Sequence, residues 1–205
     1  MTYYEFRTRW YELSCFSIRQ VYAWQPGFDR NNLFRWTKSG LLIRLRQGYF
    51  TFPEYKELRD YTLFFANRIY RPSYVSLYTA LSFYGMIPEA IVQITSISSR
   101  KTISFTNPIG EYTYKTIQPR LMFGYSIKPI SDSAVIHIAE PEKALLDLLY
   151  LYPEYDTPQA LEDLRLDEDY LHDEMKTSLL KEYAQRFQVK ALENRVNQLL
   201  KTYGL

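Results

Sequence analysis

Residues 29–52 constrain the fold of this chain most, because their apolar period changes from that of a helix to that of a strand. Leu33 and Trp36 have the three-residue spacing of one helix face. Across residues 43–46, apolar and basic side chains alternate, as in a strand with one buried face. Gln47-Gly48 then supplies a tight turn before a second, aromatic strand. We therefore expect a short helix followed directly by a β-hairpin.

Two further helices are expected before this stretch. The first spans residues 2–13, where apolar residues recur at helical spacing. The second begins at Ser17, which forms a capping box with Gln20, and ends at Pro26-Gly27. Asp29 is a good N-cap for the third helix. The residues expected to face inward on the first two helices are Tyr3, Phe6, Trp10, Leu13, Ile18, Val21 and Trp24. Three helices and a hairpin in this order predict a winged helix-turn-helix.

The solvent side of the third helix and of the hairpin is basic, with five cations against one anion in residues 29–52. Such cations neutralise phosphates and release counterions, so this pattern predicts contact with double-stranded DNA. The helix that enters the major groove reads bases near its N-terminus, where Arg suits guanine and Asn suits adenine. This rule assigns base reading to Arg30, Asn31 and Arg35. The residues expected on the DNA backbone or in the minor groove are Lys38, Arg44, Arg46 and Gln47. The alternative is a solvated basic face without a partner.

The second half of the chain predicts a helix, a β-rich middle and a helical end. Residues 55–69 carry Leu58, Tyr61, Phe65 and Ile69 at helical spacing. A short helix opens at Ser76 and stops at Gly85. Residues 91–138 then turn to β, as about five short strands bounded by turn residues. The expected strands are residues 92–98, 101–107, 110–117, 122–127 and 134–138.

Residues 141–152 predict a strong helix with Pro141 at its first position, where the missing N–H costs nothing. Lys143 and Asp147 are expected as an i,i+4 ion pair on its outer side. Glu140 precedes the helix and is a poor N-cap. From residue 157 the pattern is helical to the end, with a break around residues 187–189.

Charge divides the chain into a basic front and an acidic tail. Residues 1–135 contain 17 Lys and Arg against 9 Asp and Glu, while residues 136–205 contain 8 against 14. Such asymmetry indicates different partners for the two parts.

We expect a two-domain α+β protein. Residues 1–70 form the winged helix-turn-helix with a linker helix, and residues 71–205 form a mostly antiparallel β-sheet domain flanked by helices.

Three segments together resemble the AbiEi family, the antitoxins of the AbiE abortive-infection system. They are SGLLIRLRQGYFTF (39–52), YVSLYTALSFYGMIPE (74–89) and IAEPEKALLDLLYL (138–151). Their order and spacing match over residues 30–152, and Glu140 departs from the small capping residue that is usual in the family. The final 50 residues carry little that matches. The resemblance implies a protein without catalytic activity that acts in phage defence.

The resemblance also implies the partners. The N-terminal domain is expected to bind operator DNA, with inverted repeats, and to repress its own operon. The C-terminal domain is expected to counter a nucleotidyltransferase-like toxin, as in type IV toxin–antitoxin pairs, without a required stable complex. In the family a positive patch on the second domain is tied to toxin neutralisation. The basic residues that match this expectation are Arg100, Lys101, Lys115 and Arg120, for which ordinary solubilising charge is the alternative.

No catalytic, metal or cofactor motif stands out in the sequence. The two histidines lie far apart: His137 is expected to pack within an apolar strand, and His172 to face solvent. Cys15 is the only cysteine, so a disulfide framework and cysteine zinc sites are excluded and a reducing cytoplasm is expected. The sequence has no signal-peptide pattern and no apolar run of bilayer length.

Two other functions stay open at this point. One is a stand-alone winged-helix transcriptional regulator whose C-terminal domain senses a ligand or docks a partner. The other is a nucleic-acid-processing enzyme, suggested by Glu140 and Glu142 beside Lys143. These acids lie at a helix start rather than on paired strands, and together with Lys143 they do not form the E-x-K strand motif of metal-dependent nucleases.

Overall fold

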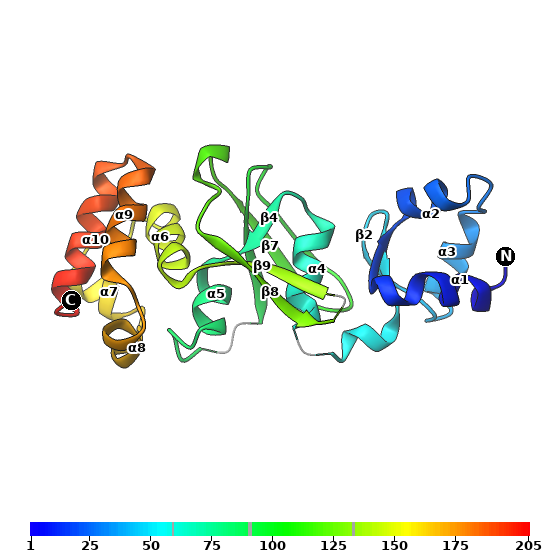
Figure 1. The fold of residues 1–205 in the computed structure, drawn as a ribbon, viewed down its shortest axis with the longest axis horizontal. Coiled ribbons are helices and arrows are strands. Elements are labelled where there is room, and N and C mark those ends of the chain that lie inside the picture. Colours follow the sequence, from blue (N-terminus) through cyan, green and yellow to red (C-terminus); the bar gives the residue numbers. More distant parts are fainter. Residues whose placement is uncertain (59, 90–91, 133) are drawn as a thin grey trace.

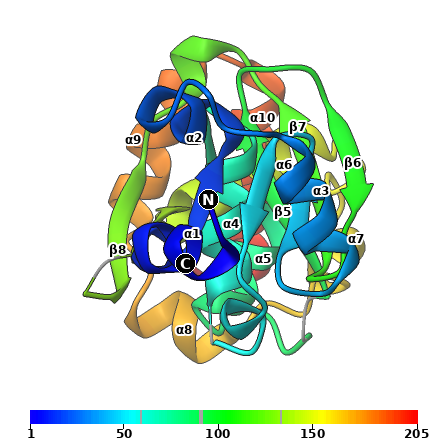
Figure 2. The same ribbon diagram turned by 90° about the vertical axis from the view of Figure 1, so that its right-hand side faces the viewer.

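The computed structural model describes residues 1–58, 60–89, 92–132 and 134–205. The chain is a mixed α+β protein, as expected. Figure 1 shows an elongated arrangement: a small N-terminal unit at one end, a β-sheet in the middle and a group of helices at the other end. Figure 2, viewed from the N-terminal end, shows the first helices in front of that sheet. We call residues 1–52 the N-terminal unit.

The N-terminal unit combines three helices with a small antiparallel sheet of strand order β1-β3-β2. The expected hairpin forms, and Gly48 has the positive φ, 80°, that its turn requires. The first strand was not predicted, because Cys15 was expected to lie between two helices. The elements are α1 (Tyr3–Trp10), η1 (Tyr11–Leu13), β1 (Cys15–Ser17), α2 (Ile18–Trp24), α3 (Asn31–Lys38), β2 (Ile43–Arg46) and β3 (Tyr49–Thr51).

Local hydrogen bonds explain where these helices start. Ser17 and Gln20 form the predicted capping box at α2. Helix α3 begins at Asn31, with Arg30 rather than Asp29 in the N-cap position. Asp29 still caps it in part, because its Oδ1 accepts the backbone N–H of Asn31 at 3.0 Å.

An aromatic cluster forms the core of the N-terminal unit. The Phe6 ring packs against Phe16 at 5.3 Å and Trp36 at 4.8 Å, measured between ring centroids. Burying one such side chain stabilises the fold by about 1.5–3 kcal/mol. Two residues expected inside, Leu13 and Trp24, are exposed, because Leu13 lies in η1 beyond α1 and Trp24 ends α2.

The single helix predicted over residues 55–69 is wrong. The structure has a short 3-10 helix, η2 (Pro53–Lys56), and a separate helix, α4 (Tyr61–Ile69). Asp60 has φ 62°, which a continuous α-helix does not allow. Leu58 is therefore exposed rather than buried, and position 59 of the predicted helix lies outside the described residues.

Within the described residues, the second sheet has the strand order β6-β7-β5-β4-β9-β8. It is mostly antiparallel, as expected, because β4–β5, β6–β7 and β8–β9 pair antiparallel, but β5 pairs with β7, and β4 with β9, in parallel. The predicted strands all form, but position 91 of the β-rich stretch lies outside the described residues. The extra strand, β4, has only three residues, all buried, and so lacks an alternating pattern. The strands are β4 (Ser73–Val75), β5 (Gln93–Ser98), β6 (Ile103–Thr106), β7 (Glu111–Thr116), β8 (Tyr125–Ser131) and β9 (Ala134–Ala139).

Helices cover both faces of the second sheet, with α4 on one side and α5 (Leu77–Phe83) with α6 (Pro141–Leu151) on the other (Figure 1). Four C-terminal helices follow; the last two pack against α6, and the break between them falls at Gln188, as predicted. The four are α7 (Pro158–Glu162), α8 (Glu168–Asp173), α9 (Thr177–Phe187) and α10 (Lys190–Thr202). No helix among the described residues is long and apolar enough to cross a membrane.

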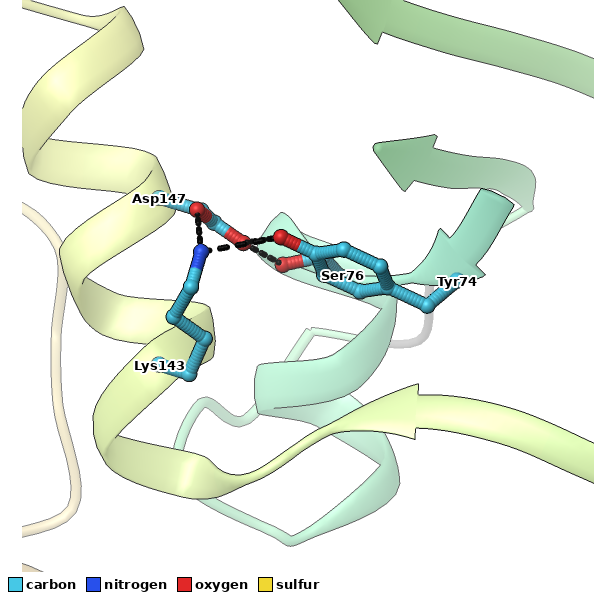
Figure 3. A network of polar contacts seen from close by, with 4 residues as sticks. All are labelled: Tyr74, Ser76, Lys143 and Asp147. Carbon is cyan, nitrogen blue, oxygen red and sulfur yellow. Dashed lines mark hydrogen bonds and ion pairs between the residues drawn. The ribbon is translucent and has the colours of Figure 1, made fainter. Parts of the chain in front are cut away.

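The ion pair expected on the outside of α6 is instead fully buried (Figure 3). Lys143 Nζ donates to Asp147 Oδ1 and, at 2.8 Å, to the Tyr74 hydroxyl. The other carboxylate oxygen, Oδ2, accepts hydrogen bonds from Tyr74 at 2.9 Å and Ser76 at 2.8 Å. Lys143 and Asp147 therefore face β4 and the start of α5. Phe187 of α9 also lies over Lys143, with its ring centroid 5.0 Å from Nζ, so a later helix helps to bury the side that the sequence left to solvent.

Glu140 precedes α6 without a side-chain cap, in line with its poor capping ability. Its carboxylate instead accepts a hydrogen bond from the Tyr183 hydroxyl of α9 at 2.7 Å. The start of α6 is thus fixed by contact with a later helix rather than by its own cap.

Candidate nucleic-acid interface

A groove of about 430 Å³ runs between α3 and the β2–β3 hairpin. We call it the α3 groove. Leu33 and Phe50 contribute apolar walls, and Gly48 at the hairpin turn closes one side. Helix α3 is held there because Leu33 and Trp36 are buried in the core of the N-terminal unit. Its outer face is therefore directed to solvent beside the hairpin.

Cations surround the α3 groove. Arg30 and Lys38 come from α3 and its start, and Arg44 comes from β2. All are exposed, and none forms an ion pair within the part of the chain that the structure describes. Asn31 lines the same groove. The structure thus brings together four of the seven residues predicted to contact DNA.

Phe34 is the apolar residue that the sequence analysis missed at this site. It lines the α3 groove and is 72% exposed. On a helix, Phe34 lies one position beyond Leu33 and so points away from the buried stripe of Leu33 and Trp36. The sequence did contain a signal for Phe34: it is an aromatic residue on the basic, solvent-facing side of the helix, where it has no partner in the core.

Arg35 is exposed but does not line the α3 groove. Its guanidinium donates to Oδ1 of Asn32, which is itself buried. This contact holds the Arg35 side chain against its own helix. Arg35 therefore lies beside the groove rather than over it.

A second hollow of about 360 Å³ continues from the α3 groove along α2 and the hairpin turn. Gln47 and Arg30 both line it, so the predicted hairpin residue and the predicted helix residue meet here. Arg19, which was not predicted, adds another exposed cation on α2. The basic face is therefore wider than residues 29–52.

Arg46 lies away from this face, although Arg44 and Arg46 were expected to share one side of the strand. The pairing of β2 with β3 shifts between Arg44 and Arg46, so a β-bulge interrupts the simple alternation. The Arg46 guanidinium donates to the backbone carbonyl of Ile69 at 3.1 Å and lies 4.6 Å from the ring centroid of Tyr70. Arg46 thus joins the N-terminal unit to the second sheet.

The four cations expected as a second basic patch do not converge. Arg100 lies over the Tyr70 ring on the α4 side of the sheet, and its neighbour Lys101 accepts the Tyr70 hydroxyl at its backbone carbonyl. Lys115 lies over the Tyr152 ring, beyond α6 on the opposite side. Arg120 donates to the carbonyl of Phe187 in α9 at 3.3 Å.

The residues with catalytic or metal-binding side chains are dispersed. Cys15 is buried, and this burial raises the pKa of its thiol to about 12. His172 is exposed, as expected. His137 is only half-buried and lines a cavity, so it is not the fully packed core histidine that was expected. Among the described residues, no three His, Cys, Asp or Glu side chains are grouped as metal ligands would be.

Comparison with known proteins does not assign this chain to a family. No family model matches the sequence, and no curated protein matches it.

Proposed function

We propose that the N-terminal unit is a winged helix-turn-helix that binds double-stranded DNA, with α3 as the recognition helix and the β2–β3 hairpin as the wing. The observation that carries this proposal is the α3 groove, where Arg30, Lys38 and Arg44 lie exposed around Phe34 and form no ion pair with any described residue. The cations neutralise phosphates. Arg30 and Asn31, at the start of α3, read base edges in the major groove. Phe34 contacts a thymine methyl group.

We further propose that the protein represses its own operon and acts as the antitoxin of a type IV, AbiE-like pair. This part rests on the resemblance of residues 39–52, 74–89 and 138–151 to AbiEi antitoxins. In this proposal the protein has no catalytic activity of its own, and its second domain counters a nucleotidyltransferase-like toxin.

The proposal that the protein binds DNA is tested by a gel-shift titration with the DNA upstream of the gene. Five exposed cations lie on this face: Arg19, Arg30, Arg35, Lys38 and Arg44. If each contacts a phosphate, log K falls with log salt at a slope of about −4 to −5. A slope near zero, or equal affinity for upstream and unrelated DNA, would contradict operator binding.

The proposal that the protein is an antitoxin is tested separately, by co-expression with the product of the neighbouring gene. Growth that the neighbour arrests is expected to be restored by the full chain and by a variant in which Arg30, Lys38 and Arg44 are all replaced by alanine to abolish DNA binding. Rescue by the wild type but not by this variant would show repression of toxin synthesis rather than neutralisation.

One observation supports the alternative that the protein is a stand-alone transcriptional regulator whose second domain senses a ligand. A cavity lined by Arg68, Arg71 and His137 lies between α4 and the second sheet. The absence of any toxin-like gene beside this one would favour that alternative.

A further inference from the structure

A cavity of about 370 Å³ lies between α4 and the strands β4, β8 and β9, apart from the proposed DNA-binding face. Its volume is in the range of small-molecule sites. Helix α4 forms one wall, and the ends of the strands form the other. We call it the α4 cavity.

Three basic side chains line the α4 cavity: Arg68, Arg71 and His137. The described lining includes no acidic side chain, and neither arginine forms an ion pair with any described residue. Burial and then the charge of Arg71 lower the pKa of Arg68. Two arginines thus line one cavity with no acidic group among its described lining, which favours occupation by an anion.

The backbone around these groups is fixed by Asn67. Its side-chain amide donates to the backbone carbonyl of His137 at 3.2 Å, and its Oδ1 accepts the backbone N–H of His137 at 2.7 Å. Arg71 Nε donates to the carbonyl of Asn67 at 3.3 Å. Helix α4, the turn after it and strand β9 are therefore tied together before any ligand arrives.

The rest of the lining suits a phosphate with a small organic group attached. Ser73 lines the cavity, and its buried hydroxyl makes no hydrogen bond within the described part of the chain. Phe64, Met122 and Tyr125 supply an apolar wall. A polar, cationic end beside an apolar wall is the usual construction of a small-molecule site.

The two arginines also line a smaller hollow of about 210 Å³ on the side of the N-terminal unit. Ser17, Gln20 and Tyr49 contribute its other polar groups. Arg68 and Arg71 therefore lie at the junction between the N-terminal unit and the second sheet.

We propose that the α4 cavity binds the phosphate group of a small phosphorylated molecule, with Arg68, Arg71 and His137 as its ligands. Arginine holds phosphate through paired, charge-assisted hydrogen bonds. The apolar wall of Phe64, Met122 and Tyr125 favours a small molecule over the backbone of DNA, which offers that wall only its sugar carbons. The site does not depend on whether the protein binds an operator.

The test titrates the full chain with inorganic phosphate and, separately, with adenosine 5′-monophosphate, at ionic strength matched with chloride. The NMR signals of the His137 imidazole and of the Arg68 and Arg71 Nε–H groups are followed. We expect saturable shifts of these signals with at least one of the two compounds and none with chloride. Tighter binding of the monophosphate would support a contribution from the apolar wall, and the absence of a saturable shift with either compound overturns the proposal.

Arg71→Gln provides the matched variant, because Arg71 is exposed at the mouth of the cavity and its loss is not expected to unfold the chain. Losing one charge-assisted contact is expected to weaken phosphate binding about tenfold or more. Arg9→Gln, an exposed cation on α1, is the control and is expected to bind as the wild type does. If Arg71→Gln weakens binding of a short DNA duplex but phosphate gives no saturable shift, the arginines belong to the DNA-binding face and the proposal is wrong.

Discussion

At the scale of single residues, the buried pair of Lys143 and Asp147 is the largest departure from the sequence pattern. Its i,i+4 spacing is that of a surface ion pair, yet both side chains have no exposed area. Burial lowers the pKa of Lys143, while the charge of Asp147 opposes this shift. Tyr74 and Ser76 donate to the carboxylate, and Lys143 donates to Asp147 and Tyr74, so both buried charges have hydrogen-bond partners (Figure 3). Such a network holds α6 to β4 and the start of α5.

We predict that Lys143→Met destabilises the protein by about 3–5 kcal/mol, because it leaves the Asp147 carboxylate buried without its counter-charge. The free energy of unfolding is measured by urea denaturation. Lys181→Met, on the exposed side of α9, is the control and is expected to change it by less than about 0.5 kcal/mol. Equal effects of the two substitutions would mean that the pair opens to solvent.

His137 predicts a dependence of stability on pH. Burial, and then the charges of Arg71 and Arg68, lower its pKa in the folded state. Its contribution to stability is therefore present above the unfolded pKa, about 6.5, and is lost as pH falls through the lower folded pKa. We expect His137→Gln to lose less stability than the wild type between about pH 7 and pH 5. The same measurement on His172→Gln, an exposed histidine, should retain the wild-type slope.

At the scale of elements, the β2–β3 hairpin serves two surfaces at once. Arg44 lines the α3 groove, while Arg46 contacts Ile69 and Tyr70 in the joint to the second sheet. The β-bulge between them separates two side chains that strict alternation would place together. A second bond supports this joint, because the Asn107 side chain donates to the carbonyl of Leu45 at 2.8 Å.

This division makes Arg44→Ala and Arg46→Ala a matched pair of substitutions. We predict that Arg44→Ala lowers operator affinity and reduces the salt slope by about 1, because it removes one phosphate contact. Arg46→Ala is expected to leave the salt slope unchanged and to lower the midpoint of thermal unfolding, since it removes a hydrogen bond and a cation–π contact from the joint. Gel-shift titrations at several salt concentrations and thermal unfolding separate the two. If Arg46→Ala reduced the slope of log affinity against log salt concentration, Arg46 would have to contact the DNA.

At the scale of the whole molecule, α4 belongs structurally with the second sheet. The Tyr114 hydroxyl donates to the carbonyl of Ala66 at 2.8 Å, and Asn67 pairs with the backbone of His137. Phe65 and Ile69 of α4 are buried. A division of the chain near η2 (Pro53–Lys56) therefore disrupts fewer of these contacts than one at residue 70.

We predict that a fragment of residues 53–205 folds, whereas one of residues 71–205 does not. The shorter fragment exposes the face of the sheet that α4 covers, including Tyr114. Each large apolar side chain uncovered costs about 1.5–3 kcal/mol, and a typical domain has only 5–15 kcal/mol of stability. Cooperative thermal unfolding, followed by circular dichroism, distinguishes the fragments. If both unfold cooperatively, α4 contributes little, and the antitoxin assay can then use either one.

The sequence by itself determined most of the local structure, because capping, turn chemistry and apolar period act over a few residues. It predicted the capping box of Ser17 and Gln20, the hairpin turn at Gly48, the strands of residues 92–138 and the solvent-facing cations of α3. Only the tertiary structure decided which faces are covered. Lys143 is buried because later helices pack over α6, and Arg46 leaves the basic face because a bulge turns it toward α4. Arg68, Arg71 and His137 come from distant segments, so no spacing in the sequence revealed the cavity that they share.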